Sequence, residues 1–275
     1  MYDITSAEFM SKVYFLLTLK YRLDLKNPLT LNEKMQWYKL NYCQNNKEII
    51  ECADKYLLQN FLRRNNLEST IIDLYGAWDS ADEIDFDKLP NQFVLKCNHG
   101  CRYNIICNNK KTFNKENAKR KLNIWMNQDF GKLNAEPHDS KIKRKIICEE
   151  YVHTYNNKIT DYKIHCFNKK PMLIEVCEDR NSFGVAAYEF MDINYNNIDK
   201  NGASIEKPPH LQEMIVIAKE VCKHFPYVRV DFYDLKNKPV IGELTFVHGA
   251  GLSTTISKKQ DIEFGKYFDL SKIKQ

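Results

Sequence analysis

Residues 227–247 read YVRVDFYDLKNKPVIGELTFV and carry the clearest structural signal in the chain. The first seven residues alternate between apolar and polar side chains, which is typical of a β-strand because successive side chains point to opposite faces. Val228 and Val230 would share one face, and Arg229 and Asp231 the other. A polar KNK segment then separates this strand from a second apolar stretch. The pattern predicts a β-hairpin.

The predicted hairpin brings two carboxylates together. A hairpin centred on Asn237 pairs Asp231 with Glu243, and the same register pairs Arg229 with Thr245. Directly opposed side chains have Cβ atoms about 4.5–5.5 Å apart, so two like charges destabilise the sheet unless a cation bridges them. Mg²⁺ binds carboxylates and completes its shell with substrate phosphates, so we expect a magnesium site here. The alternative is a solvated sheet face with ordinary charges, and a bulge at the turn would shift the register by one residue.

Two loops are candidates for contact with a ligand. Residues 246–251, FVHGAG, follow the second strand, and a glycine-rich segment at that place favours close approach of the backbone to a ligand. Residues 97–104, CNHGCRYN, follow Lys96. Backbone N–H groups of such a loop and a neighbouring lysine can hold a polyphosphate. A β-hairpin with a polar turn is the alternative for this second loop.

Cysteine and histidine residues near the second loop also raise the question of a zinc site. The possible ligands are Cys97, His99, Cys101 and Cys107. The first two cysteines lack the tight spacing of a zinc knuckle, and no second cysteine pair follows them. Structural zinc is therefore a minor alternative, and we expect His99 to be a hydrogen-bonding residue of the loop and not a metal ligand.

The bulk properties exclude several classes of protein. A chain of 275 residues can form one large α/β domain or two lobes with a sizeable core. The net charge of +5 is too small and dispersed to indicate nucleic acid, although it suits an anionic nucleotide. Nine cysteines without the rhythm of a secreted domain, and no visible secretory signal, indicate reduced thiols in the cytoplasm. The longest apolar run, 13–19, is too short to span a membrane, so it predicts a buried helix, with peripheral membrane contact as the lesser alternative.

Hydrophobic periodicity predicts a mixture of helices and strands, that is, an α/β (α+β) fold. Helices are expected at residues 5–20, 29–41, 47–66 and 114–128, and after Pro208-Pro209 through about Lys223. Strands are expected at residues 93–95, 105–106, 145–152, 160–168, 171–178 and 184–190, in addition to the hairpin.

A series of ordered motifs resembles the ATP-grasp superfamily, and more narrowly the TupA-like ATP-grasp proteins of bacterial surface-polysaccharide gene clusters. The resemblance extends from about residue 28 to residue 265. The motifs are LNEKMQW (31–37), ADKY (53–56), LP (89–90), FVLKCNHG (93–100), EEY (149–151), DYK (161–163), RVDFY (229–233) and GELTF (242–246). Each motif is weak alone, but their order and spacing form a strong joint signal.

The resemblance implies an ATP-grasp fold, in which two α+β lobes grip ATP behind a helical N-terminal segment. We therefore expect a helical region at 1–85, a small lobe with the phosphate loop at 86–150, and a C-terminal lobe with the magnesium-binding hairpin at 151–275. The chain is short for this superfamily, so its N-terminal substrate domain would be reduced to helices.

The resemblance also implies roles for individual residues. The expected catalytic residues are Arg229, Lys96 and Arg180. The expected nucleotide-binding residues are Lys55, Lys96, Asn98, His99, Gly100, Glu149, Glu150, Val152, Asp161 and Lys163. The expected Mg²⁺ ligands are Asp231, Glu243 and Thr245. Many ATP-grasp ligases have asparagine where this chain has Thr245, which puts a second Mg²⁺ in doubt.

The implied reaction uses ATP to convert a carboxylate into an acyl-phosphate, which an amine then attacks. The narrower expectation is an amide between an amino acid and a uronic acid carboxyl of a capsular, O-antigen or teichuronic-type polysaccharide or its precursor. A kinase acting on a sugar hydroxyl and a non-catalytic nucleotide- or glycan-binding module stay open as alternatives. A glycosyltransferase is disfavoured because the sequence has no DxD-like arrangement at the carboxylates. Neither a nucleic-acid partner nor a particular oligomeric state is indicated.

Overall fold

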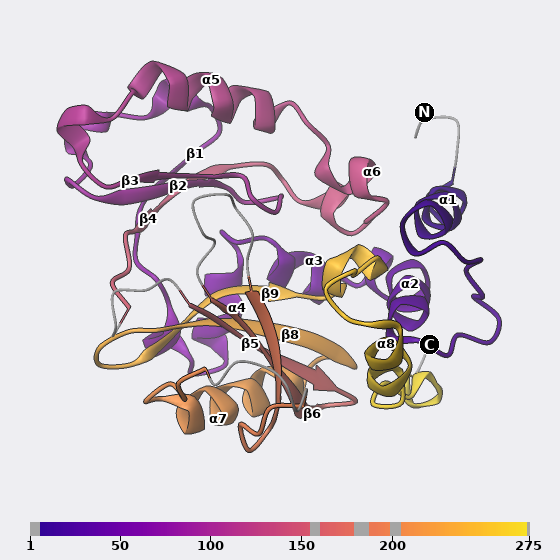
Figure 1. Ribbon diagram of the computed structural model, residues 1–275. Helices are drawn as coiled ribbons and strands as arrows, with labels where there is room; N and C mark the ends of the chain where they lie inside the picture. Colours follow the sequence, from indigo (N-terminus) through magenta and orange to yellow (C-terminus); the bar gives the residue numbers. More distant parts are fainter. Residues whose placement is uncertain (1–5, 155–159, 179–186, 199–204, 274–275) are drawn as a thin grey trace. The chain divides into compact units, whose positions relative to one another are not determined.

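The computed structural model describes residues 6–154, 160–178, 187–198 and 205–273. The chain divides into two compact units. Unit 1 consists of Met1–Cys43 and His153–Gln275, and unit 2 of Gln44–Val152. Each unit combines helices with one antiparallel sheet, which confirms the predicted mixed α/β class (Figure 1). The three-part division at residues 85 and 150 stays a prediction.

Unit 1 contains a five-stranded antiparallel sheet with the order β7-β6-β5-β8-β9. Its strands are β5 Asp161–Phe167, β6 Lys170–Glu178, β7 Ala187–Asp192, β8 Tyr227–Asp234 and β9 Pro239–Thr245. The strands predicted at 160–168 and 171–178 are confirmed. The strand predicted at 184–190 is observed at 187–192, and residues 184–186 lie outside the described part of the chain.

The register of β8 and β9 at the carboxylates is the predicted one. Asp231 pairs with Glu243, and Arg229 pairs with Thr245. Because side chains alternate along each strand, these four side chains belong to the same face of the sheet. The hairpin prediction is therefore confirmed at the positions that matter for the proposed metal site.

The turn of this hairpin differs from the prediction. Asp234 pairs with Pro239, so the turn is one residue shorter than a hairpin centred on Asn237. Gly242 is then the extra residue of a β-bulge, because Ile241 and Glu243 take the neighbouring places in the ladder. The bulge compensates for the short turn and restores the predicted pairing of the carboxylates.

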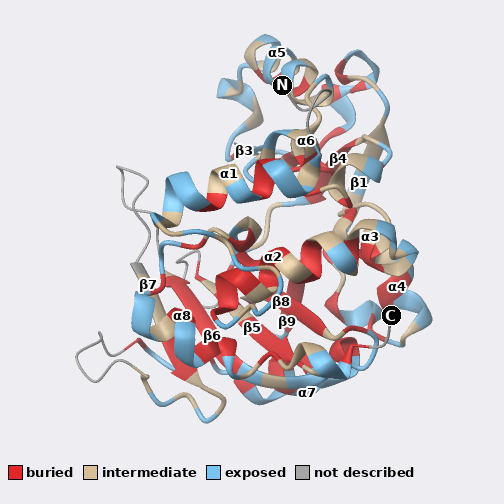
Figure 2. Ribbon diagram, turned by 90° about the vertical axis from the view of Figure 1, so that its right-hand side faces the viewer, coloured by how far each residue is buried: buried red, intermediate tan, exposed pale blue. Residues whose placement is uncertain are grey.

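The helices of unit 1 cover parts of both faces of the sheet. They are α1 Ala7–Leu19, α2 Leu31–Asn41, α7 Leu211–Cys222 and α8 Lys258–Gly265, with the short 3₁₀ helices η7 His248–Gly251 and η8 Leu270–Lys272. Helix α7 packs on the apolar face of β5, β6 and β8, where Cys166 Sγ lies 3.8 Å from the carbonyl oxygen of Ala218. Helix α2 packs against η7 and α8. Figure 2 shows β5, β6 and β8 as buried along most of their length.

Helix α1 contains the longest apolar run of the chain. Met10, Ser11 and Phe15 are buried, whereas Leu16 and Leu17 are 47% and 61% exposed. The expected buried helix is thus buried on one side only. Among the residues described, no helix combines the length and apolar content that a membrane crossing requires.

Unit 2 contains a four-stranded antiparallel sheet with the order β1-β4-β2-β3. Its strands are β1 Leu74–Trp78, β2 Phe93–Cys97, β3 Asn104–Cys107 and β4 Ile146–Glu150. The last three confirm the strands predicted at 93–95, 105–106 and 145–152. Strand β1 was not predicted, because the segment LYGAW has no clear alternation of apolar and polar residues.

The helices of unit 2 are shorter than predicted. They are α3 Lys47–Ala53, α4 Leu58–Arg64, α5 Lys115–Met126 and α6 Phe130–Asn134, with 3₁₀ helices η1 Cys43–Asn45 at the boundary, η2 Glu68–Thr70, η3 Ala81–Glu83, η4 Phe86–Lys88, η5 Lys110–Thr112 and η6 Asp139–Lys141. The single helix predicted at 47–66 is wrong. Asp54 ends α3 with an extended backbone, and its Oδ1 accepts hydrogen bonds from the backbone N–H groups of Tyr56 and Leu57 at 2.8 and 3.3 Å. This local turn competes with the helix.

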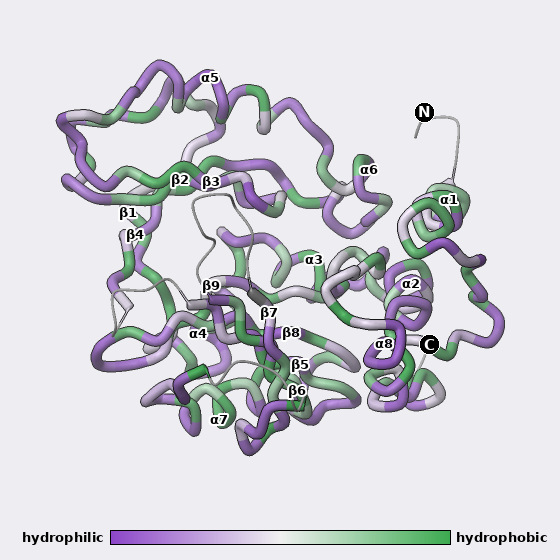
Figure 3. The backbone as a smooth tube through the Cα atoms, in the orientation of Figure 1, coloured by the Kyte–Doolittle hydropathy of each residue, from purple (hydrophilic) through white to green (hydrophobic). Residues whose placement is uncertain are grey.

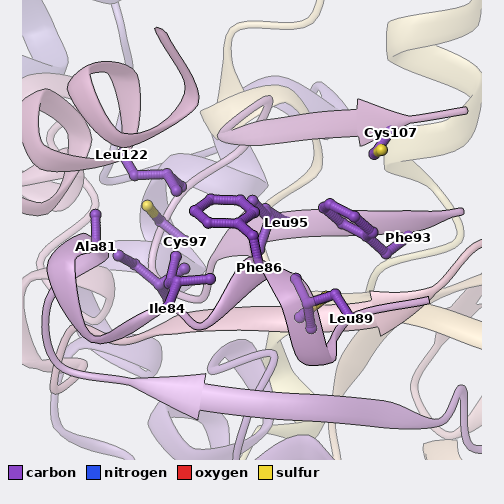
Figure 4. Packing of buried hydrophobic residues seen from close by; sticks show 11 residues of the cluster. Ala81, Ile84, Phe86, Leu89, Phe93, Leu95, Cys97, Cys107 and Leu122 are labelled. Atoms are coloured by element: carbon purple, nitrogen blue, oxygen red, sulfur yellow. The ribbon is translucent and has the colours of Figure 1, made fainter. Parts of the chain in front are cut away.

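The core of unit 2 lies between its sheet and helix α5. Figure 4 shows Leu122 of α5 near Cys97 and Phe86, within a cluster of buried apolar side chains. The rest of α5 is mostly hydrophilic, as Figure 3 shows. Cys97 and Cys107 belong to this core, where they pack as small apolar side chains. Among the described residues, neither grouping of metal-ligating side chains includes these cysteines, so the zinc alternative gains no support.

Candidate active site

One face of the sheet of unit 1 carries two rows of polar side chains. Glu175 of β6, Lys163 of β5 and Asp231 of β8 are direct neighbours in register, and Asp231 is followed by Glu243 of β9. In the next row, His165 faces Arg229, which faces Thr245. Most of these groups are buried, so the alternative of a solvated sheet face is wrong. The row opens to solvent at the edge strand β9, where 32% of the Glu243 side chain is exposed.

Asp231 is the centre of the ion pairs on this face. Arg229 donates from Nε and Nη2 to the two oxygens of Asp231 at 2.7 and 2.6 Å, which is the bidentate geometry that makes arginine–carboxylate pairs strong. Lys163 Nζ lies 2.9 Å from Asp231 Oδ2. Arg229 Nη2 also donates to Thr245 Oγ1 at 3.1 Å and lies 3.7 Å from Glu243 Oε1. The structure thus gathers five residues that the family resemblance assigned to catalysis, nucleotide binding or Mg²⁺ binding.

Negative charge exceeds positive charge in this cluster. Its four carboxylates belong to Asp161, Glu175, Asp231 and Glu243, and its two cations to Lys163 and Arg229. Four carboxylates and two cations leave two negative charges. An uncompensated charge away from water is costly, so the cluster favours the binding of further positive charge. We refer to these six residues as the carboxylate cluster.

The pKa shifts follow from this crowding. Burial raises the pKa of Asp231, and Glu243 raises it further, while Arg229 and Lys163 only partly oppose this effect. Burial alone would lower the pKa of Lys163 and of Arg229, but Asp231 holds both above their ordinary values. Both basic groups are therefore cationic at neutral pH.

Three buried residues beside Arg229 were assigned no role from the sequence. Glu175 Oε2 accepts a hydrogen bond from His165 Nε2 at 3.0 Å, and it lies 3.7 Å from His248 Nδ1. Burial lowers the pKa of His248 to about 3 and also lowers the pKa of His165. A signal for Glu175 was present, since it is the one charged residue within the apolar run MLIEVC of β6. His248 lies in the glycine-rich segment 246–251 that the sequence already indicated for ligand contact, whereas His165 gave no signal.

In unit 2, two of the expected nucleotide-binding residues form an ion pair. Lys96 Nζ contacts Glu149 Oε2, and the side chains are 14% and 8% exposed. Lys96 of β2 pairs with Ile147 of β4, and Glu149 of β4 pairs with Val94, two residues before Lys96. Of the remaining residues of this group, Glu150 is exposed and Val152 is half-buried. Arg180 lies outside the described residues.

The loop after Lys96 is fixed to the end of helix α3. Lys55 Nζ donates to the carbonyl oxygen of Gly100 at 3.0 Å, and its backbone N–H donates to the carbonyl oxygen of Asn98 at 3.3 Å. The Asn98 side chain donates to Asp54 Oδ1 at 2.8 Å and accepts from the backbone N–H of Lys145 at 2.7 Å. The structure therefore brings Lys55, Asn98 and Gly100 together, with the Asn98 amide committed to holding the loop.

His99 and Gly100 are packed within the same loop. His99 Nε2 lies 3.2 Å from the carbonyl oxygen of Gln128, which confirms the expected hydrogen bond, and burial lowers the pKa of His99. A Cβ atom on Gly100 would lie 2.5 Å from the ring of Tyr103, which stacks on Trp125 with centroids 5.1 Å apart. Only glycine fits this position without movement of Tyr103. The nucleotide-binding roles of His99 and Gly100 stay predictions.

Comparison with solved structures shows a likeness of fold. The D-alanine–D-alanine ligase from Bacillus anthracis, complexed with ATP, is 16% identical with a TM-score of 0.50, and the match covers 79% of this chain and 62% of that one. For the D-alanine–D-alanine ligase from Helicobacter pylori the values are 13%, 0.43, 80% and 59%. For N5-carboxyaminoimidazole ribonucleotide synthetase from Thermus thermophilus they are 12%, 0.42, 73% and 46%. The chain thus spans about three fifths or less of the length of these structures.

Sequence comparison gives the family. None of the curated proteins matches the chain. The profile of the TupA-like ATP-grasp family, however, matches residues 33–269, which is most of the chain and includes the carboxylate cluster and the loop after Lys96. The chain belongs to the TupA-like ATP-grasp family.

Proposed function

We propose that this chain is an ATP-dependent ligase that joins a carboxylate to an amine. The observation that carries the proposal is the direct opposition of Asp231 and Glu243 on neighbouring strands, with Arg229 on the same face. Membership of an ATP-grasp family supports ATP as the phosphate donor. Phosphoryl transfer depends mainly on charge neutralisation and positioning, and the cluster offers both.

The ligands available in the carboxylate cluster fit Mg²⁺. Asp231 and Glu243 offer carboxylate oxygens, and Thr245 adds a hydroxyl oxygen beside them. Oxygen ligands of this kind, together with substrate phosphates, are what Mg²⁺ prefers, and the two excess negative charges match its charge. Mg²⁺ bound there would neutralise the charge of the ATP phosphates. Lys163 and Arg229 would remain the protein's own cations at this place.

The proposed reaction has two steps. A carboxylate oxygen of the first substrate attacks the γ-phosphorus of ATP, and the bond from that phosphorus to the β,γ-bridging oxygen breaks, which gives an acyl-phosphate and ADP. The amine nitrogen of the second substrate then attacks the acyl carbon, the carbon–oxygen bond to phosphate breaks, and the nitrogen loses a proton. We assign to Arg229 the stabilisation of negative charge on the transferred phosphoryl group. Arg180 is a second candidate for this role.

The nucleotide-binding residues of the proposal lie mainly in unit 2. We assign Lys96 and Lys55 to the ATP phosphates, with the loop around Gly100 covering them. Glu149, Glu150 and Val152 are assigned to the adenine and ribose. The support is their place in the matched family region and the contacts between Lys55 and this loop. Asp161 and Lys163 of unit 1 complete the set.

The proposed substrates are an amino acid or amine and a uronic acid carboxyl of a surface polysaccharide or its precursor. This narrower proposal rests on the resemblance to TupA-like proteins of polysaccharide gene clusters. We also propose a cytoplasmic location, since ATP is available there. All nine cysteines, each within the described part of the chain, are thiols without a disulfide, which agrees with a reducing compartment.

The test is an assay of the full chain with ATP, Mg²⁺, the twenty amino acids, and glucuronate and galacturonate as monosaccharides and oligosaccharides. We expect ADP, a hydroxamate when hydroxylamine replaces the amine, and an amide product by mass spectrometry. A sugar kinase would release ADP without hydroxamate, and a binding module would release no ADP. Asp231→Asn should abolish the signal. ADP release that persists in this variant would contradict the proposed site.

A further inference from the structure

The guanidinium of Arg229 is held by more groups than its ion pair requires. Asp231 and Thr245 accept from Nε and Nη2, as described above. On the other terminal nitrogen, Nη1 lies 3.1 Å from His248 Nδ1. Arginine can only donate hydrogen bonds, so His248 Nδ1 must accept, and the proton of the neutral imidazole must then reside on Nε2. The contact with Arg229 thereby fixes the tautomer of His248.

The second nitrogen of His248 is fixed in turn by the segment that follows η7. His248 Nε2 lies 3.1 Å from Ser253 Oγ and, as it carries the proton, donates to it. The backbone of Ser253 is held by Asn32 of α2, whose Oδ1 accepts from the Ser253 N–H at 2.8 Å. The carbonyl oxygen of Ser253 accepts from Asn32 Nδ2 at 3.2 Å. A continuous series of hydrogen bonds thus runs from helix α2 to Arg229.

The turn between His248 and Ser253 has a left-handed backbone, which allows both residues to take part in this series of hydrogen bonds. Gly249, Ala250 and Gly251 all have positive φ angles, of 56°, 57° and 69°. A Cβ atom on Gly251 would lie 2.9 Å from the side chain of Gln36, which donates to the carbonyl oxygens of Ala250 and Gly251 at 3.0 Å. The glycines therefore permit a tight left-handed turn, and Gln36 of helix α2 holds this turn by its hydrogen bonds.

Glu175 approaches Arg229 from β6 without a direct hydrogen bond. Its Oε2 lies 3.8 Å from Arg229 Nη1, and the side chain is 2% exposed. The carboxylate accepts from His165 Nε2, so His165 Nδ1 is the acceptor of the Tyr227 hydroxyl at 3.0 Å. Glu175 thus supplies a buried negative charge, and the hydrogen bond from His165 fixes the orientation of its carboxylate group.

The same three residues, His165, Glu175 and His248, have ligand atoms within 4.8 Å of one another, which is also compatible with a metal ion. The lone pair of His248 Nδ1, however, is used by Arg229. A metal ion bound to His248 Nδ1 would have to displace the guanidinium, because this nitrogen has a single lone pair. The geometry favours Arg229 itself as the cation that this group holds.

We propose that Glu175 and His248 are positioning residues that hold the Arg229 guanidinium in one orientation. This inference rests on the proposed function, in which Arg229 faces the transferred phosphoryl group. Neither residue touches the reacting atoms; they act through Arg229. Positioning of a charged group matters because a displacement of about 1 Å can cost about a hundredfold in rate.

The test uses two isosteric substitutions of His248. In His248→Asn, the amide oxygen takes the place of Nδ1 and still accepts from Arg229. In His248→Gln, the amide takes the place of Nε2, so the bond to Ser253 can form and the acceptor for Arg229 is lost. His224→Gln, at an exposed position of the same unit, is the matched control. The direct readout is the rate of rotation about the Cζ–Nε bond of Arg229, measured by NMR on the full chain with labelled arginine. The Arg229 signal is assigned by its loss in Arg229→Lys.

We expect the rotation of Arg229 to be at least about tenfold faster in His248→Gln than in the wild type, because this variant loses one hydrogen bond to a charged group. In His248→Asn and in the control the bond is kept, so rotation should stay restricted. In the ADP assay with ATP, glucuronate, galacturonate and amino acids, kcat of His248→Gln should fall about tenfold to a hundredfold, with KM for ATP nearly unchanged. The kcat of His248→Asn should be at least about tenfold higher than that of His248→Gln. Glu175→Gln should lower kcat in the same way.

Equal rotation of Arg229 in the wild type and in His248→Gln would overturn the inference. Equal losses in His248→Asn and His248→Gln would overturn it as well, because they would mean that the turn needs a histidine only for its own packing. If wild-type protein forms no ADP, the proposed function fails, and the NMR comparison still decides whether His248 positions Arg229. The two failures are therefore distinguishable.

Discussion

The two units each place a charged group on a sheet, and the two groups differ in charge balance. In unit 2, Lys96 and Glu149 form a pair of one cation and one carboxylate. In unit 1, the carboxylate cluster has four carboxylates and two cations, centred on Asp231. The pair is balanced by itself, and the cluster is not. Charge balance therefore predicts that a divalent cation binds at the carboxylate cluster. At the pair in unit 2 it predicts that the single cationic side chain contacts an anionic ligand.

The largest expected effect comes from removing one carboxylate of the cluster. Glu243→Gln should lower ADP formation about 10²–10³-fold, the usual cost of losing one charge-stabilising group in an active site. Because like-charge repulsion is relieved, the free energy of unfolding without Mg²⁺ should not fall. The midpoint of thermal unfolding should rise with Mg²⁺ in the wild type and not in this variant.

The control for that change is Glu220→Gln, which removes a carboxylate from an exposed pair with Lys223. Its ADP formation and its response to Mg²⁺ should equal those of the wild type. An undiminished Mg²⁺ response in Glu243→Gln would show that the charge excess of the cluster does not bind the metal ion.

The next largest effect concerns the balanced pair. Lys96→Ala should raise the Kd for ATP about tenfold to a hundredfold, because a charged contact to phosphate is lost. It should also lower the free energy of unfolding by about 1–3 kcal/mol, since Glu149 stays buried without its cation. Replacing both residues, as Lys96→Met with Glu149→Leu, should recover stability and leave ATP binding weak. Calorimetric titration with ATP and urea unfolding measure the two quantities, with Lys115→Ala, from an exposed pair, as the control.

A third effect tests the packing of the loop beside Lys96. In Gly100→Ala, the new Cβ atom meets the Tyr103 ring, so we expect a loss of about 1–3 kcal/mol in the free energy of unfolding from overpacking. A double-mutant cycle with Tyr103→Leu should show that the two losses are not additive, because the clash disappears with the ring. Additive losses would mean that the loop, not the ring, is strained.

The smallest effect is a dependence of stability on pH. The folded protein keeps the pKa of His248 near 3, whereas an unfolded histidine titrates near 6.5, so the unfolded state binds more protons between these values. The stability contributed by neutral His248 is therefore complete above about pH 6.5 and is lost as the pH falls. From pH 7.5 to 5.5 the wild type should lose about 1.4 kcal/mol more than His248→Asn, measured by urea unfolding. Equal losses would show that His248 is protonated in the fold.

Much of the cluster follows from one local pattern. The alternation in residues 227–233 and 243–246 was sufficient to predict the pairing of Asp231 with Glu243, because a hairpin links strands that are close in sequence. Lys163 and Asp161 were identified only through the family resemblance. Their place beside Asp231 depends on the pairing of β5 with β8, which are distant in sequence, and no local signal sets that pairing.

Two parts of the fold escaped prediction for different physical reasons. The helix expected at 47–66 has continuous periodicity, and its break at Asp54 depends on side-chain hydrogen bonds to the backbone that periodicity does not report. His248 had no assignable partner because Arg229 and Ser253 reach it only after the chain turns at η7. A local side-chain hydrogen bond therefore determines the first outcome, and tertiary packing determines the second.

The bulge at Gly242 has a consequence for how the hairpin tolerates change. Deleting Gly242 would leave every remaining pair of β8 and β9 aligned, because Ile241 and Glu243 already occupy consecutive places in the ladder. Gly242 is thus dispensable for the alignment of the two strands and instead alters the local twist. A Cβ atom at this position would lie 2.9 Å from the Tyr233 ring. Shortening the strand by this one glycine would leave Glu243 opposite Asp231 and change the direction in which its carboxylate points.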